Sequence, residues 1–226
     1  MNVDFQIKDE VLRYLGHKNQ EVDDITDKLI DKSIAEINRL VKVRYIYKFF
    51  NISDDRKNLK LVESNLKLSG DDIKNHLDKS KSCVLMALTL GHEVDKKIRY
   101  YEHTSMTKAI ILDASATAYI EEVCDSLCIE IENSLEEGKI LTSRYSPGYG
   151  DLPIAIQNDF LSTLNAEKMI GLHASSHSIL IPRKSVTAIA GVVDSDQRME
   201  ESSCINCDKY GSCDFSKGGK GSGYQR

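Results

Sequence analysis

The chain has 226 residues, of which 41% are hydrophobic and 29% are charged. That length permits one sizeable domain, or one domain with an appendage. The composition is typical of a soluble globular protein and excludes disordered, collagen-like and membrane-bundle proteins. The net charge of −5 argues against non-specific binding to nucleic acid.

The sequence predicts a cytoplasmic protein with neither nucleic acid nor a membrane as a partner. The longest apolar stretch, residues 83–90, is far below the roughly 20 residues that a membrane-spanning helix requires. The first residues, MNVDFQIKDE, have neither the basic n-region nor the apolar h-region of a signal peptide. In the cytoplasm the six cysteines are expected to be reduced thiols or metal ligands rather than disulfides.

The composition changes near residue 198, because aliphatic residues recur up to that point and almost vanish after it. We therefore expect a folded domain over residues 1–198 and a Cys/Gly-rich tail over residues 199–226. The tail holds five of the 13 glycines and three of the six cysteines. Such a composition cannot bury a core of its own.

The first half of the domain alternates between helical and strand periodicity. Residues 9–16 and 24–40 carry apolar residues at helical spacing, which predicts two amphipathic helices. Residues 41–49 alternate with a period of two, which is typical of a strand with one buried face. A small hairpin over residues 59–68 and a short helix over residues 69–77 are predicted to follow.

The middle of the chain predicts a buried strand and a long helix. Residues 83–90 form a continuous apolar run, which is typical of a central strand covered on both faces. A charged helix over residues 93–102 and the longest helix, over residues 107–137, are expected next. Small side chains crowd residues 114–118 of that helix. They allow close approach to a neighbouring helix, which is the commoner cause, or to a ligand.

The last part of the domain predicts short elements of both kinds. A strand over residues 139–142, a Pro/Gly-rich loop over 146–153, a helix over 154–164 and strands over 170–181 and 185–193 are expected. Strands and helices do not follow a regular βαβ rhythm. We therefore predict an α+β fold, with helices flanking a twisted, largely antiparallel sheet.

The most unusual local sequence is RYSPGY, residues 144–149. Pro147 and Gly148 favour a type II turn, because proline presets the second position and glycine supplies the positive φ of the third. Such a turn exposes backbone N–H groups. Arg144 adds a five-donor fork for a carboxylate, and Tyr149 adds an apolar ring with a polar tip. These groups could hold a small zwitterion, although on composition alone an ordinary surface turn is the commoner interpretation.

The pattern R-x-x-x-G-Y formed by Arg144, Gly148 and Tyr149 resembles the S-adenosylmethionine-binding signature of the activation (reactivation) domain of cobalamin-dependent methionine synthase. Three further segments resemble that domain in the same order: residues 113–127, 153–164 and 175–191. Four ordered matches are more specific than one. The resemblance covers roughly residues 87–191, whereas the N-terminal part matches mainly in its hydrophobic pattern.

The resemblance implies roles for individual residues. Arg144 would grip the carboxylate of S-adenosylmethionine, and Tyr145 and Gly148 belong to the same cofactor-binding segment. Tyr149 would be the catalytic residue that faces the corrin and helps to hold the cobalt without a bound water. Glu121 matches a glutamate that contacts the ammonium or ribose end of the cofactor.

The implied mechanism asks little of individual residues beyond alignment of the cofactor. Glu122 follows Glu121 directly, so a shift of one residue would exchange the two. The methyl group of a sulfonium is already activated and reduced cobalt is the nucleophile, so the protein has only to align them. A Gly-rich loop between a strand and a helix is missing from the sequence, which disfavours a Rossmann-type methyltransferase.

The sequence departs from whole methionine synthases because it carries neither a D-x-H-x-x-G cobalamin motif nor modules for homocysteine and methyltetrahydrofolate. The resemblance therefore implies an activation subunit that acts on a separate cobalamin-binding methionine synthase subunit, with electrons from a flavodoxin-like or ferredoxin-like donor. Two alternatives remain open. One is a reactivation factor for another corrinoid protein, and the other is a non-enzymatic S-adenosylmethionine sensor or assembly factor.

The tail contains a second candidate site, formed by Cys204, Cys207 and Cys213. Two thiolates at C-x-x-C spacing can reach one metal ion, but a tetrahedral site needs a fourth ligand and the tail has no histidine. A zinc ion or an iron–sulfur cluster is the interpretation we favour over the two alternatives, incidental cysteines and, last, redox thiols. Cys124 and Cys128, on the long helix, are expected to act as small buried hydrophobes.

Overall fold

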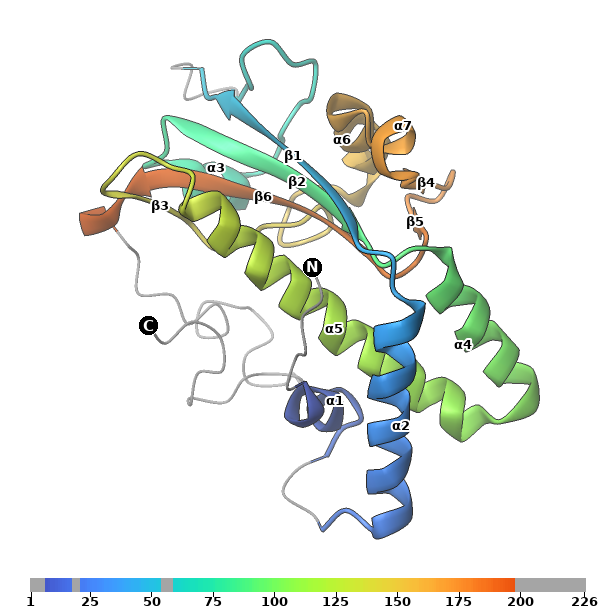
Figure 1. Ribbon diagram of the computed structural model, residues 1–226. Coiled ribbons are helices and arrows are strands. Elements are labelled where there is room, and N and C mark those ends of the chain that lie inside the picture. Colours follow the sequence, from blue (N-terminus) through green and yellow to red (C-terminus); the bar gives the residue numbers. More distant parts are fainter. Residues whose placement is uncertain (1–6, 18–20, 54–58, 198–226) are drawn as a thin grey trace.

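The structure is a computed structural model that describes residues 7–17, 21–53 and 59–197. In this part of the chain a four-stranded antiparallel sheet is covered by helices on both faces (Figure 1). The predicted α+β architecture is therefore confirmed. The tail over residues 199–226 lies outside the described residues, so the boundary near residue 198 stays a prediction. In the described part, none of the helices is long and apolar enough to cross a membrane.

The sheet has the strand order β1-β2-β6-β3, and each neighbouring pair is antiparallel. Its strands are β1 (Arg44–Asn51), β2 (Ser82–Thr89), β3 (Lys139–Leu141) and β6 (Ser185–Asp194). β2 is fully buried from Cys83 to Thr89, because its alternate side chains enter two different cores. The prediction of a central strand covered on both faces is confirmed.

One face of the sheet is covered by four helices, which are α1 (Lys8–Tyr14), α2 (Asp24–Leu40), α4 (His92–Thr104) and α5 (Met106–Glu132). The long helix α5 contacts the other three (Figure 1). Ser115 of its small-residue segment is fully buried, and its hydroxyl lies 2.9 Å from that of Ser33 on α2. Close packing of helices therefore accounts for most of the small side chains in residues 114–118.

The other face carries three shorter helices, which are α3 (Asp71–Leu77), α6 (Gln157–Leu164) and α7 (Ala166–Ile170). A 3-10 turn, η1 (Ile154–Ile156), leads into α6, and a second one, η2 (Ser195–Gln197), follows β6. Because both faces of the sheet are covered, β1 does not have the single buried face that its alternation predicts. Tyr45 packs on the α5 side, and Ile46 packs on the α6 side.

The prediction of a strand over residues 170–181 is wrong. The segment instead contains the end of α7 and a ribbon of two very short strands, β4 (His173–Ala174) and β5 (Leu180–Ile181). The hydroxyl of Ser175 accepts the backbone N–H groups of His177 and Ile179, each at 3.2 Å. These local bonds satisfy the backbone in a turn, so it does not extend as a strand.

Two further elements are shorter than predicted. The hairpin over residues 59–68 is reduced to a single bridge between Lys60 and Lys67. The long helix ends at Glu132 rather than at residue 137. The Glu132 carboxylate accepts the N–H of Leu141 at 3.0 Å, so the chain has turned back by then to start β3.

Candidate functional site

α5 carries four polar residues in one line. They recur at four-residue spacing: Asp113, Thr117, Glu121 and Asp125. Residues four positions apart lie on the same face of a helix, one turn after another. Two basic side chains from later segments, Lys184 and Arg144, bond to members of this line.

Arg144 lies between two of these carboxylates. Its Nη2 atom is 2.9 Å from Oε2 of Glu121, and its Nη1 atom is 2.5 Å from Oδ1 of Asp125. The Arg144 side chain is 22% exposed, so the pairs are partly shielded from water. Burial alone would lower the pKa of Arg144, but the neighbouring acidic groups raise it above its usual range, so the guanidinium stays charged.

The side chains of Tyr145 and Arg144 lie on opposite faces of the sheet. Its backbone N–H and C=O both bond to Ile189 of β6 at 2.8 Å, which continues the sheet edge beyond β3. Successive side chains of an extended segment point to opposite faces. The ring of Tyr145 accordingly packs on the α3 side, 5.1 Å from the His76 ring, while Arg144 reaches α5.

The turn that follows has the predicted geometry but not the predicted free amides. Tyr149 donates its N–H to the carbonyl of Ser146 at 3.0 Å, and Gly148 has a φ of +93°, as a type II turn requires. The N–H of Gly148 bonds to the carbonyl of Leu152 at 2.9 Å. Because these two amides are used inside the loop, the expectation that they are open to a ligand is wrong.

The loop is fixed to the start of α3. The Asp151 carboxylate accepts the N–H groups of Asp71 at 2.5 Å and Asp72 at 3.2 Å, so it caps that helix from outside. Gly150 has a φ of +47°, and a Cβ atom there would meet the Asp72 carboxylate and the Tyr145 hydroxyl. The conformation that places Tyr149 is therefore specific to glycine at this position.

The charge of Glu121 acts on two tyrosines, Tyr149 and Tyr14. Tyr149 is 59% exposed, and its ring meets that of Tyr145 edge-on with the centroids 6.0 Å apart. Its pKa is raised, first by desolvation and then by the negative charge of Glu121. Burial and the same carboxylate raise the pKa of Tyr14 on α1. No sequence pattern indicates Tyr14, because only the packing of α1 on α5 brings it near this face of α5.

Lys184 makes the other cluster on this face of α5. Its Nζ atom is 2.9 Å from Oδ1 of Asp113 and 2.8 Å from the hydroxyl of Thr117, and its side chain is 15% exposed. It belongs to the turn before β6, in which the Ser185 hydroxyl donates to the carbonyl of Pro182 at 2.6 Å. This turn is thereby attached to α5 by an ion pair in which the lysine is mostly buried and Asp113 is 48% exposed.

The cysteines of α5 are structural. Cys124 is fully buried, and Cys128 is half-buried. Burial raises the pKa of both thiols, so they remain protonated near neutral pH. The candidate metal ligands Cys204, Cys207 and Cys213 lie outside the described residues. Within those residues no group of three His, Cys, Asp or Glu side chains is placed to hold a metal.

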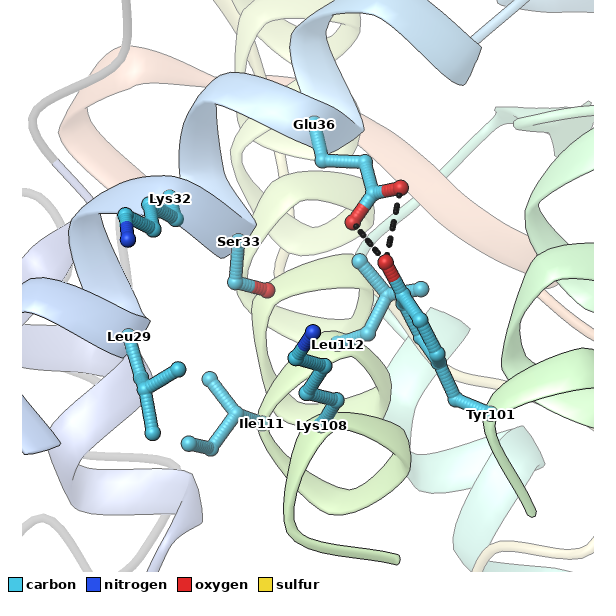
Figure 2. A pocket seen from close by; sticks show the side chains of 8 residues that line it. All are labelled: Leu29, Lys32, Ser33, Glu36, Tyr101, Lys108, Ile111 and Leu112. Atoms are coloured by element: carbon cyan, nitrogen blue, oxygen red, sulfur yellow. Dashed lines mark hydrogen bonds between the residues drawn. The ribbon is translucent and has the colours of Figure 1, made fainter. Parts of the chain in front are cut away.

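A cavity of about 120 Å³ lies elsewhere, between α2, α4 and α5 (Figure 2). At its edge the Tyr101 hydroxyl donates to the Glu36 carboxylate at 3.0 Å. Its last α5 residue, Leu112, precedes Glu121 by nine residues, which is about 14 Å along a helix. The cavity is therefore not part of the cluster around Arg144.

The fold and the cluster define an α+β domain with an arginine and two carboxylates where the sheet edge meets the long helix. No protein-family model and no curated protein matches the chain. Among the solved structures that match is the crystal structure of the MetH reactivation domain bound to AdoHcy, with a TM-score of 0.58 and 13% identity. The match covers 80% of this chain and 69% of that chain, and it shows a shared fold.

Proposed function

We propose that the protein binds S-adenosylmethionine at the cluster formed by Arg144, Glu121 and Asp125, called the Arg144 cluster below. We propose further that it supports the reductive methylation of cobalamin on a separate methionine synthase subunit. The observation that carries the proposal is the meeting of Arg144 and Glu121, 23 residues apart, at 2.9 Å. They come from two segments that resemble the same activation domain. A solved structure with the same fold is that of the MetH reactivation domain bound to AdoHcy.

The residue types of the cluster fit the amino-acid end of this ligand. An arginine fork is suited to a carboxylate, and a carboxylate such as that of Glu121 is suited to an ammonium group. Without the ligand these two side chains neutralise one another. In the complex, the carboxylate of the ligand would replace Glu121 on Arg144, and Glu121 would turn to the ammonium. Each charge then keeps a partner.

The chemistry needs little from the protein besides alignment. When bound, S-adenosylmethionine supplies a methyl group activated on its sulfonium, for transfer to partner-bound cobalamin that a flavodoxin-like or ferredoxin-like donor has reduced. Arg144 and Glu121 would hold the ligand in a near-attack geometry. Tyr149, which is 59% exposed, would present its ring to the corrin.

The first test is calorimetric titration of S-adenosylmethionine into the wild-type protein and into Arg144→Ala, with ATP as a control ligand. We expect saturable binding to the wild type that is at least about 100-fold weaker in the variant, because the variant leaves the ligand carboxylate without its charged partner. ATP should not bind at this site. Absence of binding even beside a cobalamin-loaded partner would overturn the proposal.

The second test measures methyl transfer. A cobalamin-loaded methionine synthase fragment that lacks its own activation domain would be mixed with the protein, S-adenosylmethionine and a reduced flavodoxin. We expect methylation of the cobalamin that depends on the protein, and a slower rate with Tyr149→Ala even at saturating S-adenosylmethionine. Binding without transfer to any corrinoid partner would instead indicate a sensor.

A metal in the tail is a separate proposal, carried by Cys204, Cys207 and Cys213. Metal analysis of the purified full chain, compared with a variant in which these three cysteines are serine, tests it. We expect stoichiometric zinc or iron in the wild type only. Equal metal content in the two proteins would exclude the tail as the site.

A further inference from the structure

The cavity between α2, α4 and α5 is separate from the Arg144 cluster and is large enough for a small molecule (Figure 2). Its volume is about 120 Å³. An engineered apolar cavity of about 150 Å³ in another protein binds benzene, so this one has room for about five non-hydrogen atoms. Apolar side chains form one wall of it: Leu29, Ile111 and Leu112.

The hydroxyl oxygen of Ser33, which lines this cavity, can only accept a further hydrogen bond. Ser115 donates its hydroxyl proton to the carbonyl of Ile111 at 2.8 Å. Because a hydroxyl carries one proton, Ser33 is the donor in the 2.9 Å bond between the two serines. Ser33 is 6% exposed, so its remaining lone pair is available to a molecule in the cavity rather than to bulk water.

Two further acceptors lie at the edge of the cavity. The Tyr101 hydroxyl donates its proton to the Glu36 carboxylate at 3.0 Å and keeps its lone pairs. The Glu36 carboxylate accepts that bond and pairs with Lys97 at 3.1 Å. An ionised carboxylate has about four acceptor sites, so Glu36 can accept more. Ser33, Glu36 and Tyr101 therefore offer three oxygen acceptors and no further proton.

Lys108 supplies a positive charge at the solvent side of the cavity. It is one of the lining residues and is exposed, as is a second lining lysine, Lys32. The Lys108 ammonium lies 5.5 Å from the centroid of the Tyr101 ring, and no carboxylate in the described part of the chain pairs with it. Figure 2 shows this ammonium and the Ser33 hydroxyl directed toward the same space.

We propose that this cavity is a second ligand site, which binds a small aliphatic α-amino acid. The ammonium of the ligand has three N–H donors, which match the oxygens of Ser33, Glu36 and Tyr101. Its carboxylate pairs with Lys108 at the opening, and its short side chain packs on the apolar wall. A plain amine would leave Lys108 without an anion, and a plain carboxylate would leave the three acceptors without a donor.

The test compares L-valine with analogues that each change one of these groups. Isobutylamine lacks the carboxylate, isovalerate lacks the ammonium, and L-aspartate has a charged side chain in place of the apolar one. Each would be titrated into the full chain and followed by NMR of the backbone amides of α2, α4 and α5. We expect L-valine to saturate with a dissociation constant on the order of 1 mM, which suits a ligand of this size.

The analogues should bind more weakly than L-valine, each for its own reason. Isobutylamine should lose about three- to fivefold, because an exposed ion pair contributes little. Isovalerate should lose at least about tenfold, because the acceptors stay without a donor. L-aspartate should lose as much, because its second carboxylate meets the apolar wall. These measurements on the wild type do not depend on the folding of any variant.

Lys108→Met removes the charge at the opening and keeps an unbranched side chain. Affinity for L-valine should fall about three- to fivefold, whereas affinity for isobutylamine should not fall. The matched control is Lys96→Met on α4, because Lys96 pairs with Glu93 at 2.8 Å and does not line the cavity. It should change neither affinity. Arg144→Ala should also leave L-valine binding unchanged, which distinguishes this site from the proposed S-adenosylmethionine site.

Three results would overturn the proposal. The first is the absence of saturable amide shifts with L-valine at α2, α4 and α5. The second is an analogue that binds as tightly as L-valine, because the group it lacks is then not recognised. The third is an equal loss of affinity for L-valine and isobutylamine in Lys108→Met, because Lys108 would then only support the shape of the cavity. None of them depends on whether the protein binds S-adenosylmethionine.

Discussion

Two basic residues bond to the same face of α5, and their surroundings differ. Lys184 has one carboxylate, that of Asp113, and one hydroxyl, that of Thr117, at 2.9 and 2.8 Å. Arg144 has two carboxylates. The Lys184 side chain is 15% exposed and that of Arg144 is 22% exposed, and the positive charge of Arg144 also acts on the exposed Tyr149.

The difference shows how one helix face serves two purposes. At Lys184 one positive charge meets one negative charge, so that pair is complete and connects the turn before β6 to α5. At Arg144 the planar fork serves two partners at once, which a lysine ammonium does less well. The two carboxylates share one guanidinium, and the Glu121 side chain is 43% exposed, which is the arrangement that the proposed ligand site uses.

The largest expected effect is a loss of ligand affinity when the basic residue of one cluster, but not of the other, is replaced by an uncharged residue. Arg144→Met should weaken binding of S-adenosylmethionine at least about 100-fold, whereas Lys184→Met should change it less than about twofold. Lys184→Met should instead lower the free energy of unfolding by about 1–2 kcal/mol, because it leaves Asp113 without its ion pair. Calorimetry and urea denaturation measure the two quantities. Equal losses of affinity in both variants would mean that the ligand spans the whole helix face.

The next effect concerns the loop that carries Arg144 and Tyr149. Gly150→Ala should lower the free energy of unfolding by about 1–3 kcal/mol, because the new Cβ meets Asp72 and Tyr145 at a positive φ. The displaced loop should also weaken ligand binding about tenfold. Denaturation and titration of the same preparation measure both effects.

Gly16→Ala is the matched control for that loop. Gly16 also has a positive φ, +77°, but no atom lies within 4 Å of the added Cβ. We expect a loss of stability of about 1 kcal/mol from the backbone conformation alone, with unchanged ligand affinity. If Gly16→Ala weakened binding as much as Gly150→Ala does, general destabilisation would explain both results.

The central part of the fold could be predicted because its signals are strong and local. The apolar run of β2 is long enough for a strand and too short for most helices, and it required cover on both faces. The segment over residues 170–181 could not be predicted by the same argument. There the hydroxyl of Ser175 stabilises a turn, and apolar content alone does not reveal such a bond.

The candidate site could be predicted only in part. Arg144 and Glu121 were proposed from resemblance, and the structure brings them together. Asp125 follows Glu121 by one helical turn, so the helical spacing already contained the signal that was missed. Tyr14 had no such signal, because its position depends on how α1 packs on α5.

The smallest expected effect is a change in the ionisation of Tyr149 when one cluster, but not the other, loses a carboxylate. Desolvation and the charge of Glu121 raise its pKa, so a titration of phenolate absorbance should lose a component above the ordinary value of about 10 in Tyr149→Phe. Glu121→Gln should move that component only part of the way back, because the larger cause remains. Asp113→Asn, which changes the Lys184 cluster, should leave it in place.

The raised pKa of Tyr149 also predicts how the free energy of unfolding changes at alkaline pH. The pKa of Tyr149 is higher in the folded protein than in the unfolded chain. Its contribution to stability is therefore fully present while the tyrosine is protonated in both states, that is, below about pH 10. The contribution falls as the pH rises from that value through the pKa of the folded state. Tyr149→Phe should therefore lose less stability than the wild type over this range. A larger loss in the variant would show that the phenolate of Tyr149 is stabilised by Arg144 rather than opposed by Glu121.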